Sequence, residues 1–153
     1  MGSCKKCETG RSMIEMVGVL AVMGLITAGA FVLIQSGMKS QKRNRAVTEV
    51  ANIVAIIRDT YAEAPNLSML GDWSRGVDLL HNLGVMTTTP FGTNTTYSVV
   101  SSNHEGYNDV QADFAVQMRG LEEEDCMALS ERTWSQAVDA SCESGVVTLY
   151  FPR

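Results

Sequence analysis

Apolar residues gather in one long run near the start of the chain, from Met13 to Ile34. Nearly all of its 22 residues are apolar, and Glu15 is the one acid among them. A helix of this length spans roughly 33 Å at about 1.5 Å per residue, which is enough to cross a bilayer. A secretory signal has a shorter apolar core with a small-residue cleavage site after it, whereas here the small residue, Gly10, precedes the run. The pattern predicts a retained membrane anchor.

Helical periodicity continues beyond the anchor, from Gln35 to Ala64. Apolar side chains recur three and four residues apart and form one stripe, made of Val47, Val50, Ile53, Val54, Ile56, Ile57 and Tyr61. The charged residues Glu49, Arg58, Asp59 and Glu63 are expected on the opposite face. Pro65 cannot continue a helix.

We therefore predict a single helix over residues 11–64, roughly 80 Å long, whose lower stripe packs against a small sheet. This helix holds no proline, so nothing forces a kink. Gly24, Gly29 and Gly37 are its weak points, because each glycine costs about 1 kcal/mol relative to alanine in a helix.

The remaining residues, 65–153, mix short helical and strand patterns and are here called the head. A helix is predicted over Trp73–Leu83, with Asp72 as its cap and Gly84 as its stop. A second helix is expected to begin within 120–125 and to lead through Cys126 and Leu129 to Trp134. The strand-like stretches are Thr95–Ser101, Asp113–Met118 and Gly145–Phe151, while Val85–Asn94 and the residues around Asn103–Asn108 are expected to be loops. The fold class is α+β, with a long hydrophobic stem helix packed against a small antiparallel-sheet head.

Charge is shared unevenly between stem and head. Residues 11–64 carry six bases and four acids, whereas the head carries four bases and twelve acids, a net charge of −8. Phosphate binding needs clustered Lys and Arg, so the acidic head is not expected to bind nucleic acid directly. Basic residues in the stem beside an acidic head could instead favour stacking between copies, although an acidic head can also simply be soluble.

Motifs for catalysis or metal binding are absent from the sequence. There is no GxSxG, P-loop or HExxH pattern, so we expect no enzyme and no cofactor. Cys4 and Cys7 form a lone CxxC without a second ligand pair, which does not predict a zinc site. His81 and His104 lack ligand neighbours, and His81 is expected at the surface or an interface. The acids Glu122–Asp125 are contiguous on one helix, so they predict a solvated face rather than a calcium site.

The start of the chain has a more specific pattern. Gly10 is followed by Arg-Ser-Met-Ile-Glu and then by the uninterrupted apolar run, after a short leader with two lysines. This resembles the type IV prepilin (class III) signal. The segment Met23–Ala30 (MGLITAGA) resembles the corresponding part of type IVb pilins such as the toxin-coregulated pilin group, which share glycines where Gly24 and Gly29 stand here. The order of head elements, with Phe114-Ala115-Val116, Gly120-Leu121 and Cys126, is also similar to that group.

The resemblance implies a set of roles for individual residues. Residues 1–10 would be the leader, which prepilin peptidase removes by cutting between Gly10 and Arg11. The new N-terminus, Arg11, would then be N-methylated, although Arg11 stands where the family usually has Phe or Met. Glu15 would become the fifth residue of the mature chain and would pair with the freed α-amino group of a neighbouring subunit, which sets filament register. An acid at the centre of a membrane would otherwise cost about 2.5–3.5 kcal/mol.

Two cysteines in the head fit the disulfide-bounded C-terminal region of such pilins. A Cys126–Cys142 bond would stabilise the head by roughly 3 kcal/mol in the loop-entropy model, whereas the alternative is two separate buried thiols. The leader pair would not compete for this bond once it is cleaved off.

The resemblance implies a structural subunit, as a major pilin, of an extracellular type IV pilus used in adhesion, aggregation, conjugation or motility. Before assembly the chain would cross the bacterial inner membrane once, in contact with lipid, with its head in the periplasm. Its partners would be prepilin peptidase, the pilus assembly machinery of the inner membrane and further copies of itself in a helical filament. Charges flanking the anchor favour the opposite orientation, and we give the prepilin signal precedence over them. The alternatives are a minor pilin, a pseudopilin of a type II secretion-like system, or a monomeric membrane-anchored binding domain.

Overall fold

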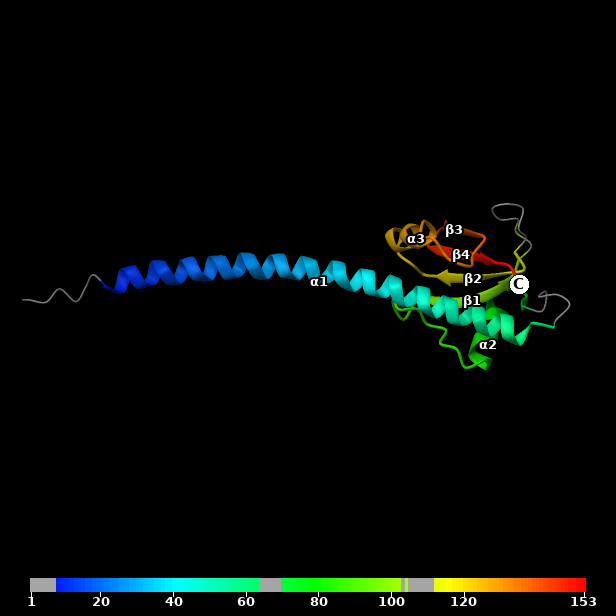
Figure 1. Ribbon diagram of the computed structural model, residues 1–153. Helices are drawn as coiled ribbons and strands as arrows, with labels where there is room; N and C mark the ends of the chain where they lie inside the picture. Colours follow the sequence, from blue (N-terminus) through cyan, green and yellow to red (C-terminus); the bar gives the residue numbers. More distant parts are fainter. Residues whose placement is uncertain (1–7, 64–69, 103, 105–111) are drawn as a thin grey trace, which may run out of the picture. The chain divides into compact units, whose positions relative to one another are not determined.

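The computed structural model describes residues 8–63, 70–102, 104 and 112–153. The chain forms two compact units, Met1–Gln41 and Lys42–Arg153. Helix α1 (Glu8–Thr60) supplies the described part of the first unit and continues into the second, where it lies beside the sheet (Figure 1). The α+β class is confirmed. The lower part of the stem belongs to the same compact unit as the head, which we call the folded unit.

Helix α1 closely matches the predicted stem. It ends at Thr60 and is followed by a turn at 61–63, so it stops four residues before the predicted end. Pro65, the predicted terminator, lies outside the described residues, as do Cys4 and Cys7 of the leader. Gly24, Gly29 and Gly37 all lie inside the continuous helix.

Four antiparallel strands form the sheet in the order β1-β2-β4-β3. Their bounds are β1 (Thr96–Ser101), β2 (Phe114–Arg119), β3 (Asp139–Glu143) and β4 (Val146–Phe151). Three of the four coincide with the predicted strands to within one residue at either end. The central pair β2–β4 is the most apolar, and the edges of the sheet are β1 and β3.

Strand β3 is absent from the predicted elements, and this omission has a physical reason. Its sequence, Asp-Ala-Ser-Cys-Glu, has few residues that favour strands, and none of its residues is fully buried. It is a strand because it pairs with β4 through a two-residue turn at Ser144 and Gly145, whose φ angles of 51° and 73° are both positive. Positive φ at both turn positions suits the twist of a hairpin, and the Ser-Gly pair was the local signal for it.

The register gives the sheet one apolar face and one face of mixed polarity. Side chains alternate along each strand, so that Tyr97, Val99, Val116, Met118, Val147 and Leu149 share one face. These residues form one core cluster with the α1 residues Ala46, Val50, Ile53, Val54 and Ile57. The predicted apolar stripe therefore packs on the sheet. The other face carries Ser98, Gln117 and Thr148, and the amide of Gln117 donates to the Thr148 hydroxyl.

Two short helices complete the folded unit. Helix α2 (Trp73–Asn82) packs on β1, and α3 (Glu123–Ser130) packs on β3 and β4. Asp72 is at the N-cap of α2, as predicted, but its side chain makes no capping bond. Gly84 follows the helix with φ of +71° and donates to the carbonyl of His81, so the predicted stop is confirmed. Trp134 lies four residues after the end of α3 rather than within it.

Candidate assembly interface

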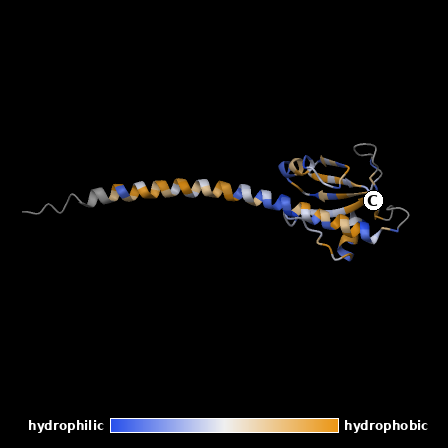
Figure 2. Ribbon diagram, in the orientation of Figure 1, coloured by the Kyte–Doolittle hydropathy of each residue, from blue (hydrophilic) through white to orange (hydrophobic). Residues whose placement is uncertain are grey.

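The N-terminal part of α1 presents an uncovered apolar surface. Each large apolar side chain that the structure exposes between Met13 and Met38 is 54–79% accessible. Figure 2 shows hydrophobic residues predominating along this stretch, before the helix becomes hydrophilic in the region of residues 39–45. Among the described residues this is the one helix long and apolar enough to cross a membrane. A surface of this kind requires lipid or protein against it, as in a membrane anchor or a signal sequence.

Glu15 interrupts this surface. Its side chain is exposed, and the large side chains that follow it along the helix are apolar. Gly10 and Arg11 lie in the first turn of α1, and cleavage between them and methylation of Arg11 stay predictions. A single copy of the chain therefore supplies an acid in an apolar stretch of the helix.

Two of the predicted weak points, Gly24 and Gly29, lie on either side of a side chain that bonds to the helix backbone. An added Cβ at Gly24 or Gly29 would meet no atom within 4 Å, so neither glycine is required by packing inside this unit. Between them, the hydroxyl of Thr27 donates to the carbonyl of Met23 at 2.7 Å. Such back-bonding slightly destabilises and often bends helices. The segment is helical here, with three features that lower the cost of unwinding it.

Hydrogen bonds and ion pairs join the lower part of α1 to the head. Arg43 donates through Nε to Oδ1 of Asp125 at 2.8 Å, and its Nη2 lies 3.3 Å from Oε1 of Glu124. The hydrogen bond to Asp125 is the main cause that raises the pKa of Arg43 above its ordinary value, against partial burial. The prediction that the acids 122–125 form a solvated face is wrong for Asp125, which is buried, and Glu124 also pairs with the stem. The contact between Arg43 and Asp125 joins residues 82 positions apart, so no local sequence pattern predicts it.

Glu49 and Arg58 also depart from the prediction that they face away from the sheet. Oε2 of Glu49 accepts a hydrogen bond from the Tyr97 hydroxyl at 3.0 Å, and Oε1 pairs with Arg45. Burial, and then the charge of Glu49, raise the pKa of Tyr97 above its ordinary value. Arg58 donates to the side chain of Gln136 and to the carbonyl of Pro152. The face of the helix that packs on the head is wider than its apolar stripe alone. These polar groups therefore also point toward the head.

The disulfide between Cys126 and Cys142 is present and joins α3 to β3, with the two Cα atoms 5.7 Å apart. The loop it closes, Cys126–Cys142, is here called the D-region. Cys126 is fully buried beside Leu129, whereas Cys142 is half-buried on the edge strand. The bond fixes an edge strand of poor intrinsic strand preference to a helix that itself contacts the stem through Asp125.

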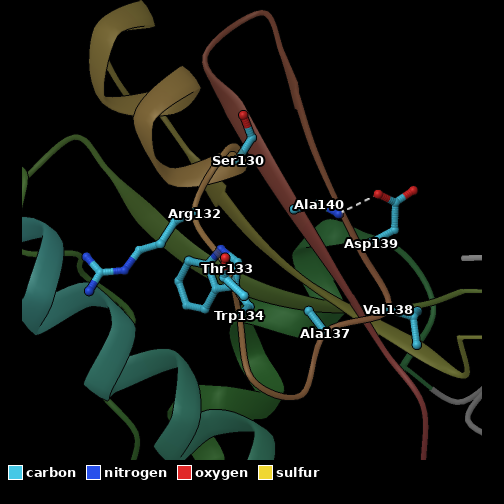
Figure 3. Close-up of a pocket in the computed structure, with 8 residues that line it drawn as sticks. All are labelled: Ser130, Arg132, Thr133, Trp134, Ala137, Val138, Asp139 and Ala140. Atoms are coloured by element: carbon cyan, nitrogen blue, oxygen red, sulfur yellow. Dashed lines mark hydrogen bonds between the residues drawn. The ribbon is translucent and has the colours of Figure 1, made fainter. Parts of the chain in front are cut away.

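A hollow of about 450 Å³ lies along the D-region between the end of α3 and β3. Figure 3 shows its lining, with Trp134 between the connecting segment and α1, and Arg132 extended toward α1. Nη1 of Arg132 donates to Oδ1 of Asn44, and Nε1 of Trp134 donates to the carbonyl of Leu129. The dashed line in Figure 3 marks the bond from the amide of Ala140 to Oδ1 of Asp139 at 2.8 Å.

Histidines do not form a metal site in the part of the chain that the structure describes. His81 is exposed on α2. Nε2 of His104 lies 2.7 Å from Oδ2 of Asp139, and its ring stacks on Tyr150 with centroids 4.0 Å apart. No group of three or more His, Cys, Asp or Glu side chains is close enough together there to hold a metal ion.

No family model matches the chain, and no curated protein matches it significantly. The architecture is nevertheless pilin-like. A long apolar N-terminal helix packs with its lower part on a four-stranded antiparallel sheet, and a disulfide closes the C-terminal region.

Proposed function

We propose that this chain is a structural subunit of a type IV pilus, and specifically a major pilin. One observation carries the proposal: the exposed apolar part of α1 follows a prepilin-like cleavage sequence and is continuous with a disulfide-closed α+β head. A membrane anchor alone would account for the apolar surface. It would not account for an acid five residues after Gly10 or for the pilin-like order of the head elements.

The mechanism begins with the precursor held in the inner membrane, with its head in the periplasm. Prepilin peptidase removes residues 1–10, and the apolar helices then leave lipid and bundle as the filament core. Van der Waals packing drives this step, because lipid tails are as apolar as the helix surface. Glu15 pairs with the α-amino group of Arg11 on a neighbouring copy, so only one axial stagger satisfies both charges. The acidic heads lie on the outside of the filament.

Unwinding near Gly24 and Gly29 would let the helices adapt to their neighbours during assembly. The two glycines and the back-bonded Thr27 support this part of the proposal, since they weaken the helix where no contact inside one copy requires glycine.

The register role of Glu15 is tested by Glu15→Ala in cells that carry the pilus machinery. We expect membrane insertion to continue and sheared filaments to disappear, because the α-amino group loses its partner. Glu143→Ala is the matched control, since Glu143 is an exposed acid at the end of β3 and should leave filaments intact. Normal filaments from the Glu15→Ala chain would refute the register role.

Mass spectrometry of the N-terminus tests processing. The mature chain should begin at Arg11, and its mass should reveal a methyl group if the peptidase modifies it. An intact Met1 in assembled material would overturn the cleavage assignment. Surface-sheared fibres dominated by this chain would support a major pilin. Absence from such fibres would favour a minor pilin, a pseudopilin or a monomeric anchored domain.

A further inference from the structure

The folded unit contains an apolar cavity that no described side chain fills. It has a volume of about 170 Å³ and lies between the lower part of α1 and the D-region. Val47, Val50 and Val54 line it from the stem, and Trp134 and Phe151 are the large apolar residues in the rest of its lining. An apolar cavity of about 150 Å³ can stay dry and bind a benzene-sized group. The cavity therefore has room for one large apolar side chain.

One arginine lies in the lining of this cavity, and a second contacts a lining residue. Arg132 lies in its lining and is exposed, and its bond goes to the neutral side chain of Asn44. Arg58 reaches Gln136, another lining residue, and its two bonds also go to neutral acceptors. These hydrogen bonds orient both guanidinium groups without cancelling their charge. An incoming apolar group with acids around it would meet complementary charge.

One exposed apolar side chain of the folded unit has acidic residues around it. In the described part of this unit the large apolar side chains that are most exposed are Met86, at 57%, and Met127, at 48%. Met127 lies on α3, with Glu123 one turn before it on the helix and Glu131, the C-cap residue of α3, four residues after it. No charged residue lies within four positions of Met86. Methionine also adapts well to irregular cavities.

We propose that Met127 of one copy inserts into the apolar cavity of a second copy, with Glu123 and Glu131 facing Arg132 and Arg58. The contact joins two different surfaces, so it leaves a free Met127 at one end and a free cavity at the other. Such a heterologous contact can propagate into an open helical assembly, whereas a symmetric dimer contact would close on itself. The inference deepens the proposed filament role and rests on it.

The test places the photoreactive residue benzoyl-phenylalanine at position 127 of the full-length chain, in cells that carry the pilus machinery. Irradiation of membranes and sheared filaments should give a species of twice the chain mass. Its cross-linked peptides should map to residues 47–54 or 132–136 of the second copy. The matched control carries the same residue at Met86, which is similarly exposed but lies outside an acidic setting, and should not map there.

Charge variants provide a second measurement. Glu131→Arg alone and Arg132→Glu alone should each reduce the cross-linked dimer about tenfold or more, which corresponds to about 1.4 kcal/mol. The double variant should restore it, because each copy then carries both reversed charges. A simple loss of folding would not be rescued by the second change.

The outcomes separate this contact from the filament role. Filaments that form normally, with position 127 cross-linking to lipid, to another protein or to other parts of the head, would overturn the contact and leave the filament role standing. Dimers that map to the cavity in cells without filaments would support the contact and count against the filament role. Absence of both dimers and filaments would refute both.

Discussion

Helix α2 lies very close to the sheet at Gly76. One added methyl group should therefore destabilise the fold more there than at the other described glycines. A Cβ built at Gly76 would lie 2.7 Å from the amide nitrogen of Val99, and nearer still to the Val99 carbonyl oxygen and the Ser98 hydroxyl. Real Cβ atoms do not approach backbone atoms this closely. Gly76→Ala would therefore push α2 away from β1.

The expected change in the free energy of unfolding is the sum of three effects. Overpacking in a filled interior costs about 1–3 kcal/mol. Displacement of α2 also stretches the 2.7 Å bond from the Ser98 hydroxyl to the Trp73 carbonyl, which contributes about 0.5–1.5 kcal/mol. Alanine is better than glycine inside a helix by about 1 kcal/mol, which offsets part of the loss. We expect a net destabilisation of about 1–3 kcal/mol.

Thermal unfolding of the full-length chain in detergent measures this loss. For a domain of this size, about 1 kcal/mol lowers Tm by roughly 4–8 °C. Trp73 reports the transition by fluorescence, because it begins α2 and its ring lies 4.0 Å from the Arg119 guanidinium carbon. Gly92→Ala is the control, since its added Cβ would meet nothing within 4 Å. An unchanged Tm for Gly76→Ala would refute the close-packing argument.

Three further predictions concern the contacts that hold the folded unit together. Reduction of the disulfide should lower the free energy of unfolding by about 3 kcal/mol in urea titrations, because the unfolded chain regains a loop spanning a separation of 16 residues. Arg43→Ala should destabilise by about 1–3 kcal/mol in the same assay, since it leaves the buried Asp125 carboxylate without this partner. The control Arg45→Ala removes an exposed i,i+4 pair with Glu49 and should cost only about 0.3–0.5 kcal/mol. Because the pKa of Tyr97 is raised on folding, the stability it contributes is complete below about pH 10 and lost as the pH rises above that value. Tyr97→Phe should reduce the alkaline loss in Tm while lowering stability at neutral pH.

Each of these has an outcome that contradicts it. Equal urea midpoints with and without reductant would mean that the disulfide does not constrain the unfolded state. Equal losses for the Arg43 and Arg45 variants would mean that the buried contact is worth no more than a surface pair. The same slope of Tm against pH above 10 in wild type and Tyr97→Phe would assign the alkaline loss to other groups.

Local pattern determined a large part of this protein. An uninterrupted apolar run long enough to cross a membrane has one regular solution, a helix, and α1 follows it from Glu8 to Thr60. Alternating and apolar stretches bounded by turn residues located β1, β2 and β4, because side chains on a strand alternate between its faces. The stop at Gly84 was readable because a positive φ there suits glycine. The sequence around Gly10 also resembles a prepilin signal, and the cleavage that this resemblance implies stays a prediction.

Tertiary structure decided the rest. Strand β3 has little strand preference of its own and exists because β4 and the disulfide hold it at the sheet edge. Glu49, Arg58 and Asp125 were expected in solvent, since charged residues are rarely buried, yet each finds a partner distant in sequence. The cavity beside Trp134 is likewise formed by segments more than 75 residues apart. Sequence periodicity shows which face of an element is apolar. Whether a polar group on that face can be buried depends on the hydrogen-bond partners that the fold places beside it.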